Sequence, residues 1–139
     1  MHFTQHHADV ANGTREKTLV GHLGMEFHVD DSGRLCATMP VDERTHQPMG
    51  LLHGGATAAL AESLGSVGSF LLIDRTSQAV VGIEVNANHL RGVRSGSVLA
   101  VGEILHLGRT THVWDIRVQD DQGLPVAVCR LTNLIIDKR

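Results

Sequence analysis

The sequence predicts one α+β domain, in which a single long helix is wrapped by an antiparallel sheet of five to six strands. The segment 53–72 is rich in Ala and Leu and contains no proline, which favours a long helix. Segments of strand-like composition, separated by glycine-containing turns, lie on both sides of it. A chain of 139 residues suffices for one hydrophobic core, so residues 1–139 are expected to form one domain.

The other elements follow from the turns. Residues 1–17 are expected to form a flexible or peripheral segment. Two strands are expected before residue 41, on either side of the turn at Asp31-Ser32-Gly33. Polar and apolar residues alternate from His112 to Val118, as in an antiparallel strand with one buried and one solvent-exposed face. The strands expected after residue 77 are 79–90, 97–107, 112–119 and 125–136.

On a helical wheel, the 53–72 segment has an apolar stripe opposite Glu62. This stripe is expected to face the core and consists of Ala56, Leu60, Leu64, Val67 and Leu71. Small residues surround Glu62, so another group is expected to approach the helix closely there. They are Ala58, Ala59, Gly65, Ser66 and Ser69.

The composition argues against several classes of function. The net charge is −3 and the pI is near 6.3, so no basic surplus is present for nucleic acid. No strictly apolar run approaches the roughly 20 residues of a membrane span, and the first residues lack signal-peptide features. We therefore expect a cytoplasmic protein with no membrane contact. Cys36 and Cys129 are far apart and the histidines lack zinc-like spacing, so no metal is expected.

The segment Thr45 to Gly55 delivers polar side chains and bare backbone to the start of the long helix. The first N–H groups of a helix have no intrahelical partner, and the helix dipole favours negative charge there. An oxyanion could therefore be held by the N–H of Gly54 or Gly55. The alternative is that the glycine pair only makes a tight turn.

Glu62 is the only charged residue between Ala56 and Ile73, whereas a solvated helix face usually carries several charges. A lone carboxylate near a candidate oxyanion site is typical of a nucleophile or general base for acyl transfer. The alternative is an ordinary surface glutamate. The sequence contains no G-x-S-x-G, G-x-G-x-x-G or P-loop motif, which leaves a carboxylate mechanism as the leading hypothesis.

A second polar group follows in the segments 86–94 and 106–112. Arg91, Arg94 and Arg109 stand near expected strand ends, where they could pair with the phosphates of a nucleotide-bearing substrate. The alternative for these arginines is ordinary solvation of strand ends.

The segment His53 to Ser66, HGGATAALAESLGS, resembles the hotdog-fold thioesterases of the phenylacetate-pathway and Arthrobacter-type 4-hydroxybenzoyl-CoA thioesterase family. Further motifs extend the resemblance over about residues 18–136: MPVD at 39–42, THQP at 45–48, GIEVNANH at 82–89 and HLGR at 106–109. Within the family, the sequence is most similar to 1,4-dihydroxy-2-naphthoyl-CoA hydrolases and enterobactin proofreading thioesterases. Val67 is typical of the first branch. The resemblance implies a hotdog fold.

By motif, the resemblance implies that Glu62 is the catalytic carboxylate and that the N–H of Gly54 or Gly55 polarises the thioester carbonyl. The other catalytic positions that it implies are His53, Gln47 and Ser66. The first two would orient the substrate, and the serine would place the attacking water or the leaving group.

The resemblance also implies a coenzyme A site made of Gly82, His89, Leu90, Arg91, Gly92, His106, Leu107, Gly108, Arg109, Thr110 and Thr111. No metal or organic cofactor is implied, because coenzyme A is part of the substrate. Family members usually assemble as homotetramers, dimers of dimers with active sites between subunits.

The function expected is hydrolysis of aromatic acyl-CoA thioesters, such as 1,4-dihydroxy-2-naphthoyl-CoA or a benzoyl-CoA-like ester. One alternative is a proofreading thioesterase that acts on an acyl carrier protein loaded with an aryl group. Another is a noncatalytic acyl-CoA-binding module, which would use the Arg91 and Arg109 region without needing Glu62. Whether Glu62 attacks the carbonyl or activates water stays open at this point.

Overall fold

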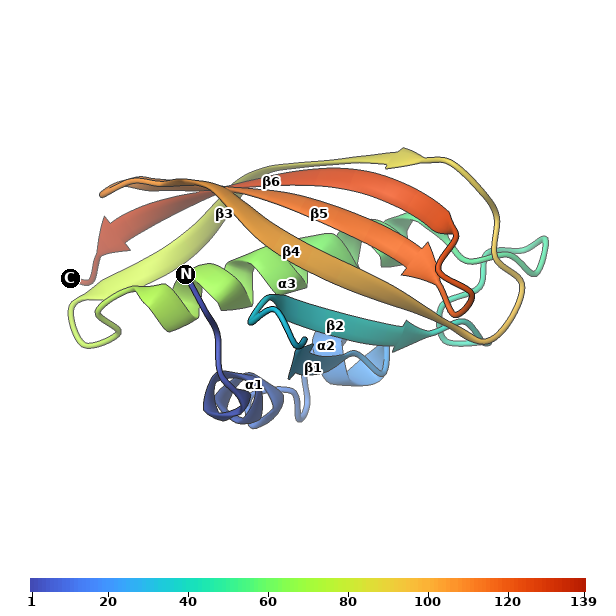
Figure 1. Cartoon of the computed structure of the whole chain (residues 1–139), viewed down its shortest axis with the longest axis horizontal. Coiled ribbons are helices and arrows are strands. Elements are labelled where there is room, and N and C mark those ends of the chain that lie inside the picture. Colours follow the sequence, from blue (N-terminus) through green and yellow to red (C-terminus); the bar gives the residue numbers. More distant parts are fainter.

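The computed structural model describes all 139 residues and shows a six-stranded antiparallel sheet curled around one helix (Figure 1). The helix in the centre is α3 (Gly54–Leu72). The strands are β1 (Glu26–Val29), β2 (Leu35–Pro40), β3 (Gln78–His89), β4 (Ser97–Leu107), β5 (Thr111–Asp120) and β6 (Pro125–Asp137). Their order across the sheet is β1-β2-β4-β5-β6-β3. The predicted α+β class is confirmed, and each strand after residue 77 ends within one residue of its predicted bounds.

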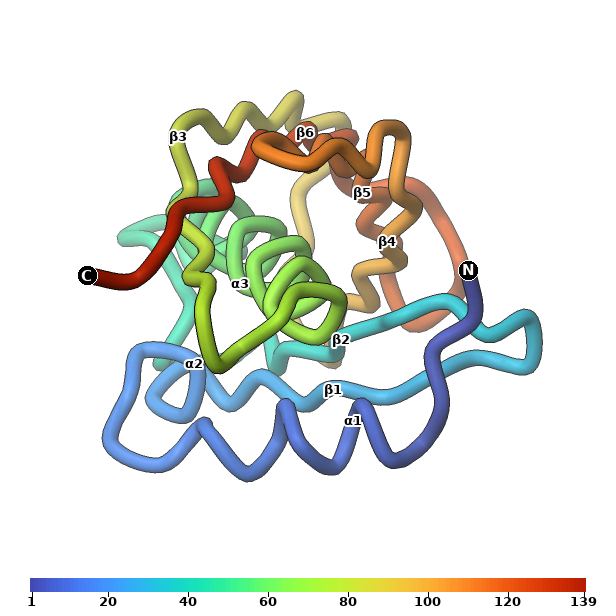
Figure 2. The backbone as a smooth tube through the Cα atoms, turned by 90° about the vertical axis from the view of Figure 1, so that its left-hand side faces the viewer, coloured from blue at the N-terminus to red at the C-terminus, as the bar shows by residue number.

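The core lies between α3 and the concave face of the sheet. Leu60, Leu64, Trp114, Ile116 and Leu131 are almost completely buried there. Figure 2, which looks along the helix, shows the sheet passing above α3, down one side through β4, and beneath it through β2 and β1. By length and composition alone α3 could cross a membrane, but in this fold it is the apolar centre of a curled sheet.

The buried arc of α3 differs from the predicted stripe. Val67 and Leu71 are only half-buried, whereas Gly65 and Ser69, where another group was expected to approach the helix closely, are buried. The curled sheet surrounds more of the circumference of α3 than a flat sheet would. The apolar stripe on the helical wheel is therefore narrower than the helix surface that the sheet buries. A Cβ on Gly68 would lie 2.5 Å from the Trp114 ring, which explains why glycine is present in this helix despite its low helix propensity.

The N-terminal segment, expected to be flexible or peripheral, forms helix α1 (Gln5–Asn12) and is followed by the one-turn helix α2 (Leu19–His22). Figure 2 shows α1 lying beneath β1, on the outside of the sheet. The Asn12 amide donates to the Phe27 carbonyl and accepts from the Phe27 N–H, both at 2.8 Å. Asn12 therefore provides hydrogen-bond partners for backbone groups on the outer edge of β1. The opposite edge of the sheet, β3, has no such cover.

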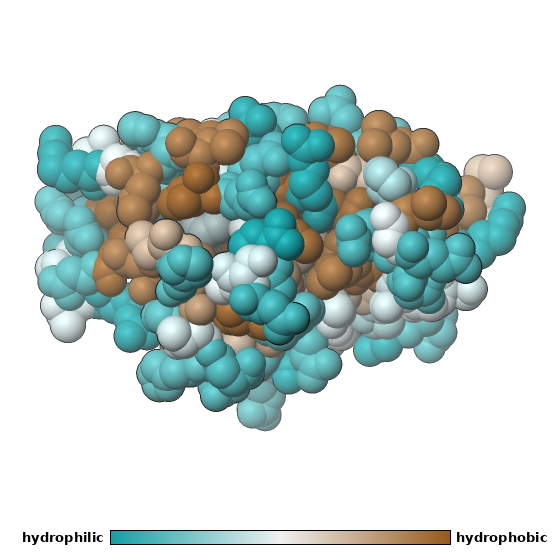
Figure 3. Space-filling model, viewed as in Figure 1, coloured by the Kyte–Doolittle hydropathy of each residue, from teal (hydrophilic) through white to brown (hydrophobic).

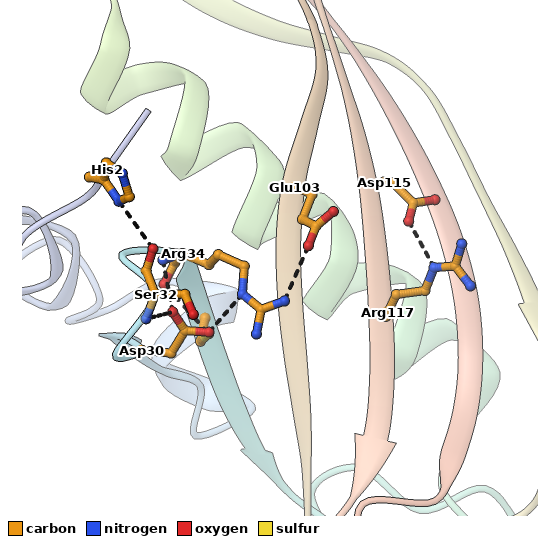
Figure 4. A network of polar contacts seen from close by, with 8 residues as sticks. His2, Asp30, Ser32, Arg34, Glu103, Asp115 and Arg117 are labelled. Atoms are coloured by element: carbon orange, nitrogen blue, oxygen red, sulfur yellow. Dashed lines mark hydrogen bonds and ion pairs between the residues drawn. The ribbon is translucent and has the colours of Figure 1, made fainter.

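Charged pairs cross the convex face of the sheet (Figure 4). Arg34 binds Asp30 at 2.7 Å and Glu103 at 3.1 Å, and thereby joins the β1–β2 hairpin to β4. Asp115 accepts from Arg117 at 2.7 Å. Exposed pairs of this kind contribute about 0–1 kcal/mol each, so they favour solubility more than stability.

Exposed apolar side chains are concentrated elsewhere, on β3 and on neighbouring strand ends. They are Val81 and Ile83 on β3, Leu105 and Leu107 on β4, and Ile136 on β6. Figure 3 shows apolar surface at the upper left of the molecule, over the region where Figure 1 places these strands.

Candidate active site

Helix α3 begins with a free backbone N–H at Gly54. His53 is the N-cap, and its Nδ1 accepts the N–H of Gly55 at 2.7 Å. The Gly55 N–H is therefore occupied, while no hydrogen bond in the structure uses the N–H of Gly54. Because Nδ1 is an acceptor, His53 carries its ring proton on Nε2. Of the two glycines considered for an oxyanion, the geometry favours Gly54.

Gln47 and the chain around His89 border the same end of the helix. The loop that carries Gln47 is held by the bonds from His53 N to Thr45 O and from Leu52 N to Val93 O, both 2.8 Å. A Cβ on Gly54 would lie 3.0 Å from His89 Nε2, so only glycine fits easily there. Together these elements border a cavity of about 410 Å³, lined by Gln47, Gly54, Thr57, His89, Arg91 and Gly92 among others.

Glu62 lies two turns further along α3 and is half-buried. No ion pair in the structure includes it, which agrees with the absence of a basic partner at helical spacing. Its carboxylate points at β3, where Oε1 occupies the space that a side chain at Gly82 would need. The backbone of β3 at Gly82 thus forms the floor of the site, the surface on which the Glu62 carboxylate lies.

A second cavity, with partly apolar walls, opens one turn beyond Glu62. Ser66 stands at its edge and donates a hydrogen bond to Asn133 Oδ1 at 3.4 Å. The cavity measures about 400 Å³ and is lined by Thr14, Ser66, Val67, Phe70, Gln78, Ala79, Val80 and Lys138. Glu62 therefore lies between two cavities, one at each end of α3.

Gly54 and Glu62 do not face one carbonyl group within a single chain. They are eight residues apart on a helix, a separation of about 12 Å at 1.5 Å per residue. A carboxylate and an oxyanion donor must both lie within about 3 Å of the same reacting group. The expectation of a carboxylate beside the oxyanion site is therefore wrong for one chain alone.

The two predicted segments for coenzyme A are also far apart. Residues 89–92 follow the end of β3, whereas 106–111 form the β4–β5 hairpin at the other end of the sheet. Through β6, Thr111 is in register with Val81 and Val118 with His89. Eight strand residues separate Val81 from His89, which is about 26 Å. One chain does not bring both segments to one ligand.

Arg91 already has a partner within the chain. Its guanidinium pairs with Asp120, and the Leu124 N–H together with Arg91 lowers the pKa of that carboxyl group. Arg94 and Arg109 take part in no ion pair. Of the three arginines predicted to bind phosphate, two are therefore free of carboxylate partners.

The sequence matches the Thioesterase superfamily over residues 49–127. The chain belongs to this superfamily. The proofreading thioesterase EntH of Klebsiella pneumoniae is 49% identical over 125 residues, which cover 90% of each chain. The structure of a mutant of thioesterase PA1618 from Pseudomonas aeruginosa is 51% identical and superimposes with a TM-score of 0.91 over 94% of both chains. A Haemophilus influenzae thioesterase is 41% identical, with a TM-score of 0.88 over 99% of this chain and 93% of its own.

These comparisons confirm the predicted hotdog fold and identify the protein as a thioester hydrolase. The hypothesis of a noncatalytic binding module is therefore not supported. Two structures of a Staphylococcus aureus relative each carry one alanine substitution, of a glutamine in one and of a glutamate fifteen positions later in the other. Gln47 and Glu62 have the same order and the same spacing in this thioesterase.

Sequence reasoning missed the polar residues that pack behind the predicted site. Ser69 and Asn133 are completely buried and bond to each other at 2.9 Å. His112, predicted as part of an alternating strand and of the polar segment 106–112, bonds to Ser69 at 3.0 Å. Ser69 is not a candidate nucleophile, because it is fully enclosed and already bonds to three side chains.

Proposed function

We propose that this thioesterase hydrolyses aromatic acyl-CoA thioesters at a site completed by two copies of the chain. The observation that carries the proposal is the separation of about 12 Å between Gly54 and Glu62 on one helix. Glu62 contacts β3, and β3 is the uncovered edge of the sheet, with Val81 and Ile83 exposed on it. A second copy that pairs along β3 would bring its own groups next to Glu62.

In the proposed reaction, the Gly54 N–H of one chain polarises the thioester carbonyl and Glu62 of the other chain supplies the carboxylate. By one route Glu62 attacks the carbonyl carbon, the C–S bond breaks, and water then hydrolyses the anhydride. By the other route Glu62 removes a proton from water as that water attacks. Either route ends with the free acid and the thiol of coenzyme A, and both draw on protein groups alone.

The cavity beside Ser66 supports an aromatic acyl group. Val67, Phe70, Ala79 and Val80 give it apolar walls, and the Phe70 ring offers a stacking partner. Thr14, Gln78 and Lys138 stand among these apolar residues. They offer hydrogen-bond partners to hydroxyl groups on an aromatic ring, which a straight alkyl chain lacks.

The proposed assembly also supports a complete coenzyme A site. Residues 89–92 of one chain and 106–111 of the other need to lie near each other, since one chain holds them about 26 Å apart. Arg94 and Arg109 have no carboxylate partner and suit phosphate groups. We extend the proposal to a dimer of dimers, for which the exposed Leu105 and Leu107 on β4 offer further apolar surface.

The first test is Glu62→Gln, assayed by release of free thiol from benzoyl-CoA, 4-hydroxybenzoyl-CoA, a naphthoyl-CoA and a straight-chain acyl-CoA. We expect kcat to fall by at least about 100-fold with little change in substrate binding, because the amide is neither a base nor a nucleophile. A kcat within a few-fold of the parent enzyme would remove Glu62 from the mechanism. Single turnover in ¹⁸O-labelled water then separates the two routes, since label in the Glu62 carboxylate requires the anhydride.

Sharing of the site is tested by complementation between two inactive variants. Gly54→Pro removes the proposed N–H donor, and its backbone geometry fits, because Gly54 is the first helical residue and His53 already has φ −68° and ψ 129°. The new Cβ would lie 3.0 Å from Nε2 of the exposed His89 side chain, so that ring has to shift slightly. Co-expression of Gly54→Pro and Glu62→Gln chains produces mixed dimers with one intact site. We expect thiol release to return in the mixed dimer and to be absent from each variant alone. Mixed dimers without activity would contradict the shared site.

A second candidate function is proofreading of aryl groups loaded on a carrier protein. It is favoured by the 49% identity to EntH, which is named a proofreading thioesterase. The same aryl group presented on coenzyme A and on a carrier protein distinguishes the two functions. A higher kcat/KM for the carrier-bound thioester would favour the second candidate.

A further inference from the structure

Four polar side chains form a buried cluster between α3 and the sheet. Ser69 and Asn133 have no exposed surface, and His112 and Trp114 are 3% and 1% exposed. Ser69 Oγ lies 2.9 Å from Trp114 Nε1, 2.9 Å from Asn133 Nδ2 and 3.0 Å from His112 Nδ1. No buried side-chain nitrogen or oxygen in the protein lacks a partner, so the cluster is fully satisfied.

The chemistry of these groups fixes the direction of each bond around Ser69. The indole N–H and the amide NH₂ can only donate, so both donate to Ser69 Oγ. The hydroxyl proton of Ser69 is then left for His112 Nδ1, which must be unprotonated to accept it. Burial lowers the pKa of His112 and favours this neutral form.

The same logic fixes the orientation of the Asn133 amide. Its Nδ2 donates to the Gly65 carbonyl at 3.1 Å and to Ser69 Oγ at 2.9 Å, which uses both protons. A reversed amide would set Oδ1 against the Gly65 carbonyl oxygen, an unfavourable contact of two acceptors. Oδ1 therefore faces Ser66, and the Ser66 hydroxyl donates its proton to it at 3.4 Å.

We infer that Asn133 is a positioning residue that holds Ser66 as a hydrogen-bond acceptor for the water that hydrolyses the substrate. Because the Ser66 proton is directed at Asn133, the lone pairs of Ser66 Oγ are left for a donor in the cavity that Ser66 lines, one turn beyond Glu62. They accept a hydrogen bond from water, but they cannot protonate a departing thiolate. The inference rests on the proposed function, and of the two roles open to Ser66 it selects the placing of water.

Asn133 is also joined to the floor of the site. It is in register with Gly82 on one side and with His112 on the other, so one row of the sheet runs from the buried cluster to the carboxylate of Glu62. A Cβ at Gly82 would lie within 4 Å of both Glu62 Oε1 and Asn133 Oδ1. The amide oxygen thus stands next to the place where the carboxylate meets the strand.

The test is a double-mutant cycle with Asn133→Leu, a substitution of similar shape, and Ser66→Ala. We expect each to lower kcat about 10-fold with KM within about twofold of the parent, and the double variant to lose about 10-fold in total. The matched control is Trp114→Phe, which removes a donor at the far side of the same cluster and is expected to keep kcat while it lowers Tm. Asn133→Ala serves as a second variant with the same expectation if leucine prevents folding.

Several outcomes would overturn the inference. They are a kcat within twofold of the parent for both Asn133 variants, a loss of about 100-fold in the double variant, or an equal loss of kcat in Trp114→Phe. The role of Ser66 is checked with thiophenol and N-acetylcysteamine thioesters of one aromatic acid. We expect the same 10-fold loss with both leaving groups in Ser66→Ala, and a loss confined to the less acidic thiol would mean that Ser66 protonates the leaving group.

The Glu62→Gln variant separates this inference from the proposed function. Full activity in Glu62→Gln would overturn the proposed function itself. Loss of activity in Glu62→Gln, together with additive effects of Asn133→Leu and Ser66→Ala, would overturn only the role of Asn133.

Discussion

Gly82 lies at the point on β3 where the Glu62 carboxylate meets the sheet. In Gly82→Ala we expect the new methyl group to displace Oε1, which is the flexible end of its side chain, while the strand keeps its register. Activity should therefore fall at least about 10-fold, with Tm within about 2 °C of the parent. Thiol release and thermal unfolding, measured on the same preparation, check both parts. Unchanged kcat would show that the carboxylate works from a different position.

Substitution of Gly68 is expected to lower stability and to leave activity almost unchanged, the reverse of the effect expected for Gly82→Ala. A methyl group there would lie 2.5 Å from the rigid Trp114 ring, which cannot move aside as a glutamate side chain can. In Gly68→Ala the gain of about 1 kcal/mol in helix propensity is outweighed by overpacking, which costs about 1–3 kcal/mol. We expect a Tm lower by several degrees and an almost unchanged kcat at a temperature where the variant is folded. A raised Tm would contradict this account of the helix glycines.

At the level of single residues, the sequence predicted the groups that stand out from their surroundings. Glu62 was found because it is the only charge on its helix, and the structure gives it no ion pair. Asn133 was missed, although a signal existed. The inward positions of β6 are Cys129, Leu131, Asn133 and Ile135, so the asparagine is a polar residue on the apolar phase of the strand.

Among the elements, the turn between α3 and β3 carries a charge that links stability to pH. Asp74 accepts hydrogen bonds from the hydroxyls of Thr76 and Ser77 and from the Thr76 N–H, and these lower its pKa to about 2. The unfolded value is about 3.9, so the charged carboxylate stabilises the folded state fully above about pH 4. That contribution declines as the pH falls toward 2.

Asp74→Ala tests this linkage. We expect the urea midpoint of the parent protein to exceed that of the variant at pH 6, and the difference to shrink below pH 4 and to become small as the pH falls through about 2. Asp31→Ala, at an exposed residue in another turn, serves as the control. A difference that does not depend on pH would mean that Asp74 acts through the conformation of the turn and not through its charge.

The strands and the long helix were predictable from the sequence, whereas the two short helices were not. Strand alternation and glycine turns located β3 to β6 to within one residue. Helices α1 and α2, of eight and four residues, are too short to be stable alone and depend on contacts made in the folded protein. Examples are the bonds from Asn12 to Phe27 and the packing of Phe3 beside Trp114, with ring centroids 6.2 Å apart.

For the whole molecule, the uncovered β3 edge predicts that activity depends on pairing of two chains. Ile83 is 56% exposed on this edge, so Ile83→Lys places a charge where the second copy would pack. We expect a folded monomer by light scattering and at least about a 100-fold loss of thiol release. Leu124→Lys, in the exposed β5–β6 turn, is the matched control and should keep both assembly and activity. A fully active monomer would contradict the two-chain site.

The spatial arrangement of the site lay beyond the sequence. Residues 89–92 and 106–111 were correctly located on strand ends, but their separation depends on the order of strands in the sheet. That order is set by which strands share the concave face around α3, a property of the packed core. The assignment of roles to these residues therefore remains a prediction, and mixed dimers are its most direct test.

The strand order also has a consequence for the synthesis of the chain. β6 is made last, yet it lies between β5 and β3, so β3 has no partner within the sheet until residues 125–137 are available. The chain must hold a twelve-residue strand unpaired while some fifty further residues are produced. A ribosome that stalls before β6 would therefore carry a nascent chain in which β3 is wholly unpaired and one edge of β5 is exposed, the form that chaperones bind and that aggregates most readily.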